Sequence, residues 1–122
     1  MKPTTVAVVG TGLIATHKHL PALKKLGSRA RIVGVCDVNI EAAKRVANEF
    51  GVARAFGSLD ELMAAEQPDI VDICTPPRTH AKIAIDALQK GANVMIEKPM
   101  AISVEECDQI IEAARASNRK IC

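Results

Sequence analysis

The sequence predicts an α/β fold: a doubly wound parallel sheet with helices on both faces, giving three layers. The first reason is that apolar runs of strand length alternate with stretches of helical pattern, which is typical of parallel strands joined by crossover helices. The second is a G-x-G-x-x-A turn at residues 10–15, directly after the first apolar run. A turn of this kind between a strand and a helix offers backbone N–H groups to phosphates.

The apolar runs predict five strands, the third of them short and weak, at residues 5–9, 31–36, 52–56, 69–74 and 92–96. The runs are almost continuously apolar, as expected of strands that are covered on both faces. The last residues, 119–122, have the pattern of a further strand that is just beginning.

Caps and stops bound the helices between these strands. The first helix follows the glycine turn and includes Leu20, Leu23 and Leu26. Side chains suited to N-caps stand at Asn39, Ser58 and Ser103, and glutamates three residues after both serines complete capping-box patterns. Glycines that stop helices stand at Gly27, Gly51 and Gly91. The last helix is expected at residues 103–117, with an apolar stripe of Val104, Cys107, Ile110, Ile111 and Ala114.

Composition indicates one globular domain over residues 1–122. The chain is 48% hydrophobic, and its net charge of +2 is too small to indicate binding to nucleic acid or an anionic membrane. It has no Trp or Tyr on which bases could stack. No apolar run approaches the roughly 20 residues of a membrane span. The cysteines lack paired-motif spacing, so we expect reduced thiols and a cytoplasmic protein; they are Cys36, Cys74, Cys107 and Cys122.

The glycine turn is the first candidate site. Gly10 allows a tight turn out of the strand, Gly12 lets the backbone approach a pyrophosphate, and Ala15 is small enough for the helix to lie close to the strand. Glycine pairs also occur in such turns for backbone reasons alone. The position of this pair, between a strand and a helix at the start of the chain, favours a dinucleotide site.

Asp37 ends the second apolar run, where a carboxylate accepts hydrogen bonds from the adenosine ribose. It would repel a 2′-phosphate, and Val38 supplies no guanidinium to receive one, so the pair favours NAD over NADP. The alternative is that Asp37 and Asn39 only form a turn and a helix cap.

Two further segments end strands at the same predicted edge. Thr75 and Pro76 must leave the sheet, because proline lacks the N–H of the ladder. They either wall the cofactor or only initiate a helix, and His80 on that helix either faces the cleft or is an ordinary exposed histidine, which the sequence favours. Glu97 and Lys98 are either a strand-ending charge pair or a site in which the lysine binds or protonates a substrate oxygen.

A metal site is not expected. His17 and His19 stand two residues apart, so on a helix they point to different faces. The sequence shows no cysteine or acid that completes a ligand set with them.

The chain resembles the N-terminal domain of the Gfo/Idh/MocA oxidoreductases over essentially its whole length. The resemblance rests on V-V-G-T-G-L-I-A, V-G-V-C-D, D-I-C-T-P-P-R-T-H and E-K-P-M-A, of which the last two are the most specific. It implies a Rossmann domain that holds NAD or, with less support, NADP. Reactions in that family are typically reversible hydride transfers at a carbon of a sugar or cyclitol.

The resemblance also implies roles for individual residues. The phosphates would lie against Gly10, Gly12, Leu13, Ile14 and Ala15. Asp37 would bind the ribose, and the cleft would be lined by Thr75, Pro76 and His80. Glu97 and Lys98 match the family's E-K-P, which makes Lys98 the catalytic candidate.

The chain departs from the family in length, since it ends where the family's second domain begins. That domain carries the substrate pocket and the usual acid-base histidine, so we expect dinucleotide binding with little or no turnover. The uncovered strand edge predicts some self-association. Two alternatives remain: a nucleotide-sensing module without catalysis, and a dehydrogenase-like protein that keeps its cofactor as a structural element. Lys98 argues against the sensing module, which has no use for a lysine beside the nicotinamide.

Overall fold

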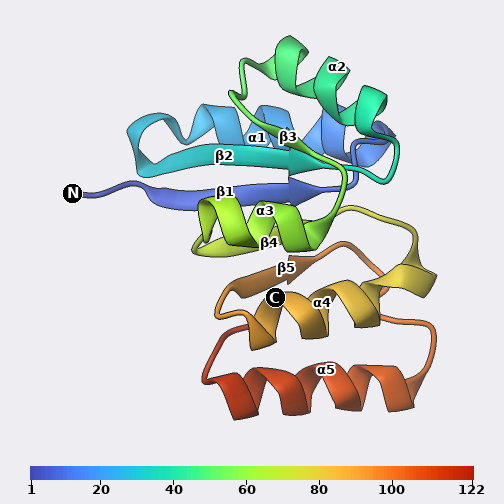
Figure 1. The fold of residues 1–122 in the computed structure, drawn as a ribbon. Coiled ribbons are helices and arrows are strands. Elements are labelled where there is room, and N and C mark those ends of the chain that lie inside the picture. The colour runs from blue at the N-terminus through green and yellow to red at the C-terminus, as the bar shows by residue number, and fades with distance from the viewer.

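All five predicted strands lie in one parallel sheet, in the order β3-β2-β1-β4-β5 (Figure 1). The computed structural model describes residues 1–122. The strands are β1 (Thr4–Val9), β2 (Ala30–Cys36), β3 (Ala55–Phe56), β4 (Ile70–Ile73) and β5 (Asn93–Ile96). The chain moves outward from β1 in one direction to β3 and then returns to add β4 and β5 on the other side. This reversal makes the sheet doubly wound, as predicted.

Five α-helices connect and flank the strands: α1 (Leu20–Lys25), α2 (Ile40–Phe50), α3 (Leu59–Glu66), α4 (His80–Gln89) and α5 (Val104–Ser117). The predicted caps form, because the side chains of Asn39, Ser58 and Ser103 each accept a hydrogen bond from a backbone N–H in the first helical turn. No helix is long and apolar enough to cross a membrane.

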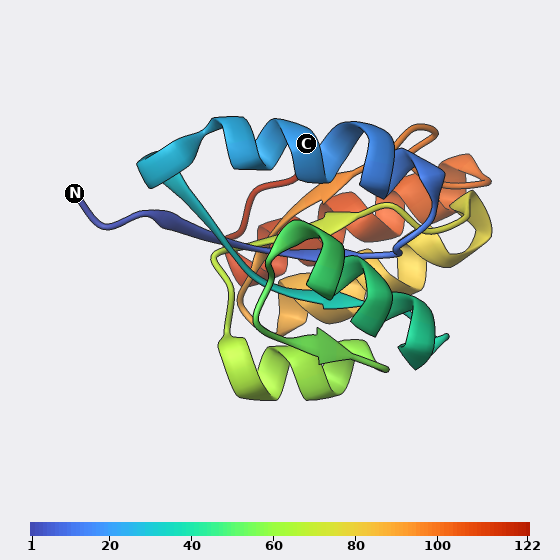
Figure 2. The ribbon, with the colours of Figure 1, turned by 90° about the horizontal axis from the view of Figure 1, so that it is seen from above.

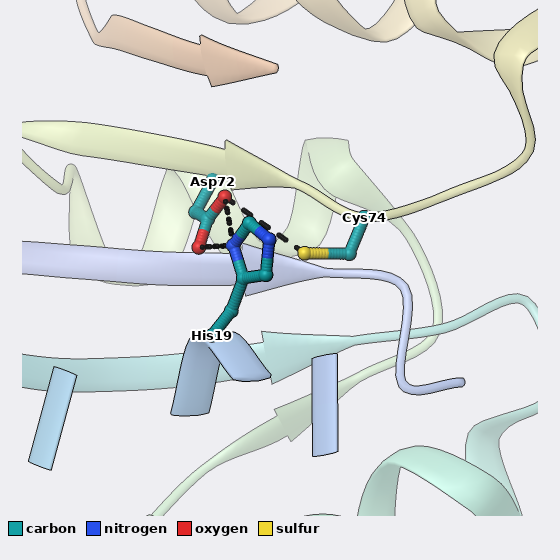
Figure 3. A group of neighbouring side chains, drawn as sticks. All are labelled: His19, Asp72 and Cys74. Carbon is teal, nitrogen blue, oxygen red and sulfur yellow. Dashed lines mark hydrogen bonds and ion pairs between the residues drawn. The ribbon is translucent and has the colours of Figure 1, made fainter. Parts of the chain in front are cut away.

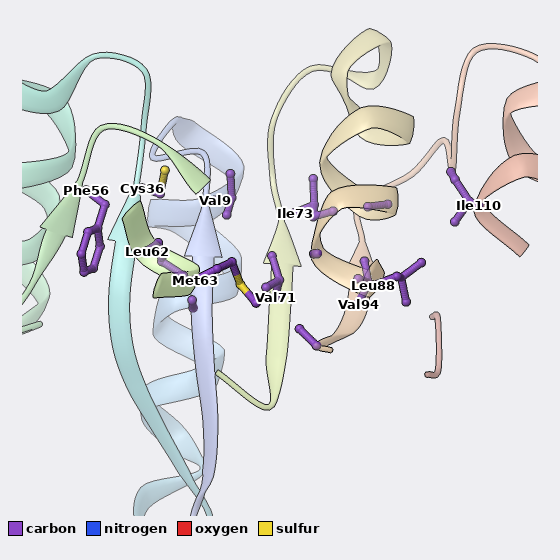
Figure 4. Packing of buried hydrophobic residues seen from close by; sticks show 14 of the residues in the cluster. Val9, Cys36, Phe56, Leu62, Met63, Val71, Ile73, Leu88, Val94 and Ile110 are labelled. Atoms are coloured by element: carbon purple, nitrogen blue, oxygen red, sulfur yellow. The ribbon is translucent and has the colours of Figure 1, made fainter. Parts of the chain in front are cut away.

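The two faces of the sheet carry separate apolar cores, so the predicted three layers are present (Figure 2). Successive side chains of a strand point to opposite faces, and Val8 accordingly belongs to the core that includes residues of α1 and α2, while Val9 belongs to the core that includes residues of α3, α4 and α5. Phe56 is the one aromatic side chain of the larger core, which is otherwise made of aliphatic residues with Cys36 and Met63 (Figure 4).

The chain after the glycine turn differs from the single α-helix that its leucines predict. A π-helical turn, Ala15–His19, precedes α1, and a 3-10 turn, Gly27–Arg29, follows it. Single π turns widen a helix by one residue and are frequent at functional sites. Here the turn ends at His19.

The last helix is placed as predicted, but its apolar stripe is only partly buried. Ile110 and Ala114 are in the core, whereas Val104 is 73% exposed. The predicted stripe is therefore wrong at Val104, because the residues of α5 that pack against the core lie in its middle and last turns. Beyond α5, Ile121 pairs with Val94 in a parallel bridge, which confirms the start of a sixth strand.

The turn after β1 depends on a glycine at position 10. Gly10 has a φ of +96°, and a Cβ there would lie 2.8 Å from the carbonyl carbon of Cys74. Gly12 has no left-handed backbone, and a Cβ there would meet no atom within 4 Å. The two glycines therefore have different roles: Gly10 serves the fold, and Gly12 leaves space open.

We expect Gly10→Ala to lower the free energy of unfolding by about 1–3 kcal/mol from backbone strain alone, with the clash against Cys74 adding to it. Gly12→Ala should change that free energy by less than about 0.5 kcal/mol. Urea denaturation of the two variants beside the wild type measures both effects. Equal destabilisation by both substitutions would show that the close approach at Cys74 does not constrain the turn.

Candidate functional site

The four candidate segments meet at one edge of the sheet, as predicted, because all the strands run parallel and their carboxyl ends coincide. A cavity of about 630 Å³ opens along this edge. Eight of the predicted cofactor residues line it: Gly10, Gly12, Leu13, Ile14, Asp37, Val38, Thr75 and Pro76. The other four, Ala15, His80, Glu97 and Lys98, are not part of its lining.

The glycine turn presents backbone and exposed apolar side chains to the cavity. The space beside Gly12 is open, which is the shape that a closely approaching phosphate requires. Leu13 and Val38 are 75% and 97% exposed, so the rim has apolar surface that a bound ring could cover. Ala15 is fully buried in the core with Val8, which fits its predicted role in packing the helix on the strand.

Asp37 points back to the glycine turn. Its Oδ2 accepts hydrogen bonds from the backbone N–H of Thr11, at 3.0 Å, and from the Thr11 hydroxyl, at 2.8 Å. Its Oδ1 accepts one from the N–H of Asn39, at 2.9 Å. Partial burial opposes ionisation, but the bonds from Asn39 and Thr11 outweigh it and hold the pKa of Asp37 below its ordinary value. The side chain is therefore an ionised acceptor at neutral pH.

Asp37 and Asn39 also form the turn and cap that were the structural alternative, since Asn39 Oδ1 accepts from the N–H of Ala42 at 3.2 Å. The two interpretations are compatible, because the carboxylate of Asp37 lines the cavity while it makes these bonds.

The structure adds a segment that the sequence analysis missed. Gly57, Ser58 and Leu59 line the cavity at the end of β3. The rule that placed the other segments applies here too, because β3 is parallel to its neighbour. The signal was weak because β3 pairs over only two residues, Ala55 and Phe56.

His80 overturns both expectations for it, since it neither faces the cleft nor is exposed. Its side chain is fully buried at the start of α4, where Nε2 lies 2.7 Å from the carbonyl oxygen of Thr75 and Nδ1 lies 2.9 Å from that of Pro99. The ring fills the space between two strand-ending segments, and these backbone acceptors draw it inward. His80 therefore supports the wall of the cavity from behind.

Glu97 and Lys98 follow β5, beside the segment that ends β4. Lys98 is exposed, and its peptide bond to Pro99 is cis. Glu97 does not pair with a lysine. Its Oε2 lies 2.6 Å from Nε2 of His19, whose Nδ1 lies 2.8 Å from Oδ2 of Asp72. The alternative of a simple strand-ending charge pair is thus wrong for Glu97, whose partner comes from the π-helical turn.

The expectation that no acid or cysteine accompanies the histidines is also wrong for His19. The side chains of Asp72, Cys74 and Glu97 converge on it (Figure 3 shows the first two). The sequence hid this cluster because its members stand on three separate elements. His17, in contrast, is exposed.

Ligand atoms of His19, Asp72 and Cys74 lie within 4.8 Å of one another, a spacing that a metal ion could bridge. The present bonds describe an ion-pair network instead, because Nδ1 of His19 already contacts both oxygens of Asp72. Burial raises the pKa of the Cys74 thiol, with the charges of Asp72 and Glu97 adding to the rise, so this sulfur is a protonated thiol in the network.

The network holds the His19 ring between two acids. Burial disfavours the charge on His19, but its hydrogen bonds to Asp72 and Glu97 outweigh this and raise its pKa above 6.5. The hydrogen bond from His19 lowers the pKa of Glu97. Burial raises the pKa of Asp72, and the ion pair with His19 opposes that rise.

Comparison with known proteins places the chain among oxidoreductases. Residues 4–122 match the model of an oxidoreductase family with an NAD-binding Rossmann fold, Gfo/Idh/MocA. Inositol 2-dehydrogenase of Azotobacter vinelandii is 30% identical over 117 residues, which are 95% of this chain and 34% of that protein. The chain thus spans about a third of the length of this relative.

Solved structures of similar proteins contain the same fold. The WlbA dehydrogenase from Chromobacterium violaceum, in complex with NADH and UDP-GlcNAcA, superposes with a TM-score of 0.94 at 33% identity, covering 99% of this chain and 34% of that one. A variant of the 3-ketoreductase KijD10 from Actinomadura kijaniata, in complex with TDP-benzene and NADP, gives a TM-score of 0.88 at 25% identity, covering 96% and 37%. Similar structures therefore include one with NADH and one with NADP.

His19→Gln should lower the free energy of unfolding near pH 6 by about 2–4 kcal/mol, because it leaves the buried Asp72 without its cation. His19 has a raised pKa, so its contribution is complete below pH 6.5, the value for an unperturbed histidine, and is lost as pH rises through its folded-state pKa. The difference between wild type and variant should therefore shrink toward alkaline pH.

Urea denaturation from pH 6 to 9 measures this difference, with His17→Gln as the matched control. His17 is exposed and should contribute less than about 0.5 kcal/mol at any pH. A difference for His19→Gln that stays constant with pH would contradict a charged His19.

Proposed function

The chain belongs to the Gfo/Idh/MocA family of oxidoreductases, and from that premise we propose that it forms the cofactor half of an NAD-dependent dehydrogenase acting on a CH–OH group. The substrate class we propose is a sugar, cyclitol or related polyol. The names of the similar proteins support this class, since they include an inositol dehydrogenase and an enzyme bound to a UDP-sugar.

The observation that carries the proposal is the pairing of the Gly12 space with the Asp37 carboxylate in one cavity. The open space beside Gly12 suits the pyrophosphate, and the turn that holds it leads into helical backbone with free N–H groups. Asp37, ionised and anchored through Thr11, is an acceptor for ribose hydroxyls. The residues present therefore fit a dinucleotide.

We propose NAD as the preferred cofactor. The 2′-phosphate of NADP would lie against the ionised carboxylate of Asp37, and two negative charges in contact repel each other. Val38 is almost fully exposed beside it and carries no positive charge.

We assign Lys98 to the reacting end of the cofactor. When bound, the nicotinamide supplies a hydride or accepts one. Lys98 follows β5, next to the Thr75 segment that lines the cavity, and its exposed ammonium group is free to bind or protonate a substrate oxygen. Oε2 of Glu97 contacts His19 at 2.6 Å, and the structure shows no ion pair between Glu97 and Lys98.

For the location we propose the cytoplasm. All four cysteines are free thiols, and two of them are buried among apolar residues, where they act as small hydrophobic side chains. This usage is typical of a reducing compartment.

Calorimetric titration should show tighter binding of NADH than of NADPH, and Asp37→Ala should weaken NADH by about 1.5–3 kcal/mol, the usual value of a hydrogen bond to a charged group. The preference over NADPH should disappear in this variant, because the repulsion disappears with it. Asp108→Ala is the matched control, since Asp108 is exposed on α5 and remote from the cavity. Unchanged NADH affinity in Asp37→Ala would refute the ribose contact.

Gly12→Ala should bind NADH at least about tenfold more weakly, because the added methyl group occupies the space assigned to the pyrophosphate. The same titration measures this loss. Since the variant is expected to fold normally, a thermal melt equal to that of the wild type separates lost binding from lost structure. Full affinity in a folded Gly12→Ala chain would place the phosphates elsewhere.

A further inference from the structure

Two histidines hold the residues on either side of Lys98. Nε2 of His19 lies 2.6 Å from the Glu97 carboxylate, and Nδ1 of His80 lies 2.9 Å from the Pro99 carbonyl oxygen. His19 comes from the π-helical turn before α1 and His80 from the start of α4, so the two rings reach the same segment from different layers of the domain. Lys98 itself is exposed between them.

Both rings are anchored at their other nitrogen to the end of β4. Nδ1 of His19 contacts Asp72, which is fully buried within that strand. Nε2 of His80 contacts the carbonyl oxygen of Thr75, which follows the strand and lines the cavity. The position of the Lys98 segment is thereby tied to the same strand end that forms the wall of the cofactor cavity.

The His19 link is strongest with a charged ring between two ionised carboxylates. Ionised carboxylates only accept hydrogen bonds, so a histidine that bonds one at each nitrogen must donate from both. The titratable groups around the ring are Asp72 from β4, Cys74 just after that strand, Glu97 and Lys98 from the segment after β5, and Lys18 from its own turn. The two carboxylates contact it directly, and their charges balance the imidazolium.

We propose that His19 is a positioning residue for Lys98: by holding Glu97 against the buried Asp72, its imidazolium ring keeps the lysine at the reacting end of the cofactor cavity. This inference rests on the proposed function, in which Lys98 stands beside the nicotinamide. It adds His19, a residue of the π-helical turn that is not part of the cavity lining, to the residues that determine the position of Lys98.

The test follows the reactivity of Lys98 in the 122-residue chain. Limited acetylation by N-hydroxysuccinimidyl acetate at pH 7, resolved by peptide mass spectrometry, reports the rate at each lysine with and without NADH. In the wild type, NADH should slow acetylation of Lys98, and exposed Lys82 on α4 is the internal reference. His19→Gln should reduce this protection roughly three- to tenfold, a range typical of coupled neighbours, and His17→Gln should leave it unchanged.

Glu97→Ala is the second variant, because it leaves the buried pair of His19 and Asp72 intact and so tests the link even if His19→Gln does not fold. It should reduce protection of Lys98 as strongly as His19→Gln. If His19 and Glu97 act as one unit, the variant with both substitutions should lose no more of the Lys98 protection than the more strongly affected single variant.

Persistence of Lys98 protection in either single variant, or additive losses in the double variant, would overturn the positioning role. Failure of the proposed function gives a different result. In that case the wild type shows no calorimetric binding of NADH and no protected lysine. Binding of NADH without protection of Lys98 would leave the cofactor site standing and overturn this inference alone.

Discussion

The close approach of the Gly10 backbone to the end of β4 is the constraint on which the cofactor edge depends. The N–H of Gly10 donates to Cys36 at the end of β2, and the N–H of Cys74 donates to Val9, both at 2.7 Å. A side chain at position 10 would separate these strand ends. The glycine therefore lets the turn after β1 lie between β2 and β4, with Asp37 on one side and Thr75 on the other. One absent Cβ thus brings three segments into a common cavity.

β4 and the residue Thr75 that follows it position the segment after β5. An acid in the middle of a buried strand is costly unless a cation accompanies it, and Asp72 is satisfied by His19. The same strand end receives His80 through the Thr75 carbonyl oxygen. Both interactions continue to the segment after β5, so these side chains add to the backbone bond from the N–H of Glu97 to the carbonyl oxygen of Ile73, at 3.0 Å, that joins the ends of β4 and β5. The proposed chemistry of Lys98 depends on this second arrangement.

The sequence was sufficient for the sheet and for most of the cavity lining, because both follow from local patterns, but it missed the segment of Gly57, Ser58 and Leu59. Apolar runs predicted the strands, and the parallel order then placed Gly12, Asp37 and Thr75 at one edge. The two histidine contacts could not be predicted in this way. His19 ends a π-helical turn that the leucine pattern does not indicate, and its partners Asp72 and Glu97 stand 53 and 78 residues away. His80 was misplaced because its burial depends on the carbonyl oxygen of Pro99, which no periodicity reveals.

The measurement that tests the account most directly is an amide NMR titration of the isotopically labelled chain with NADH. We predict that the shifted resonances lie at the carboxyl edge, in residues 10–14, 37–38, 57–59 and 75, and that Lys98 shifts with them. Shifts confined to the groove at the opposite end of β5, lined by Leu26, Val94 and Ile121, or no shifts at saturating NADH, would contradict the assignment of the cofactor to this edge.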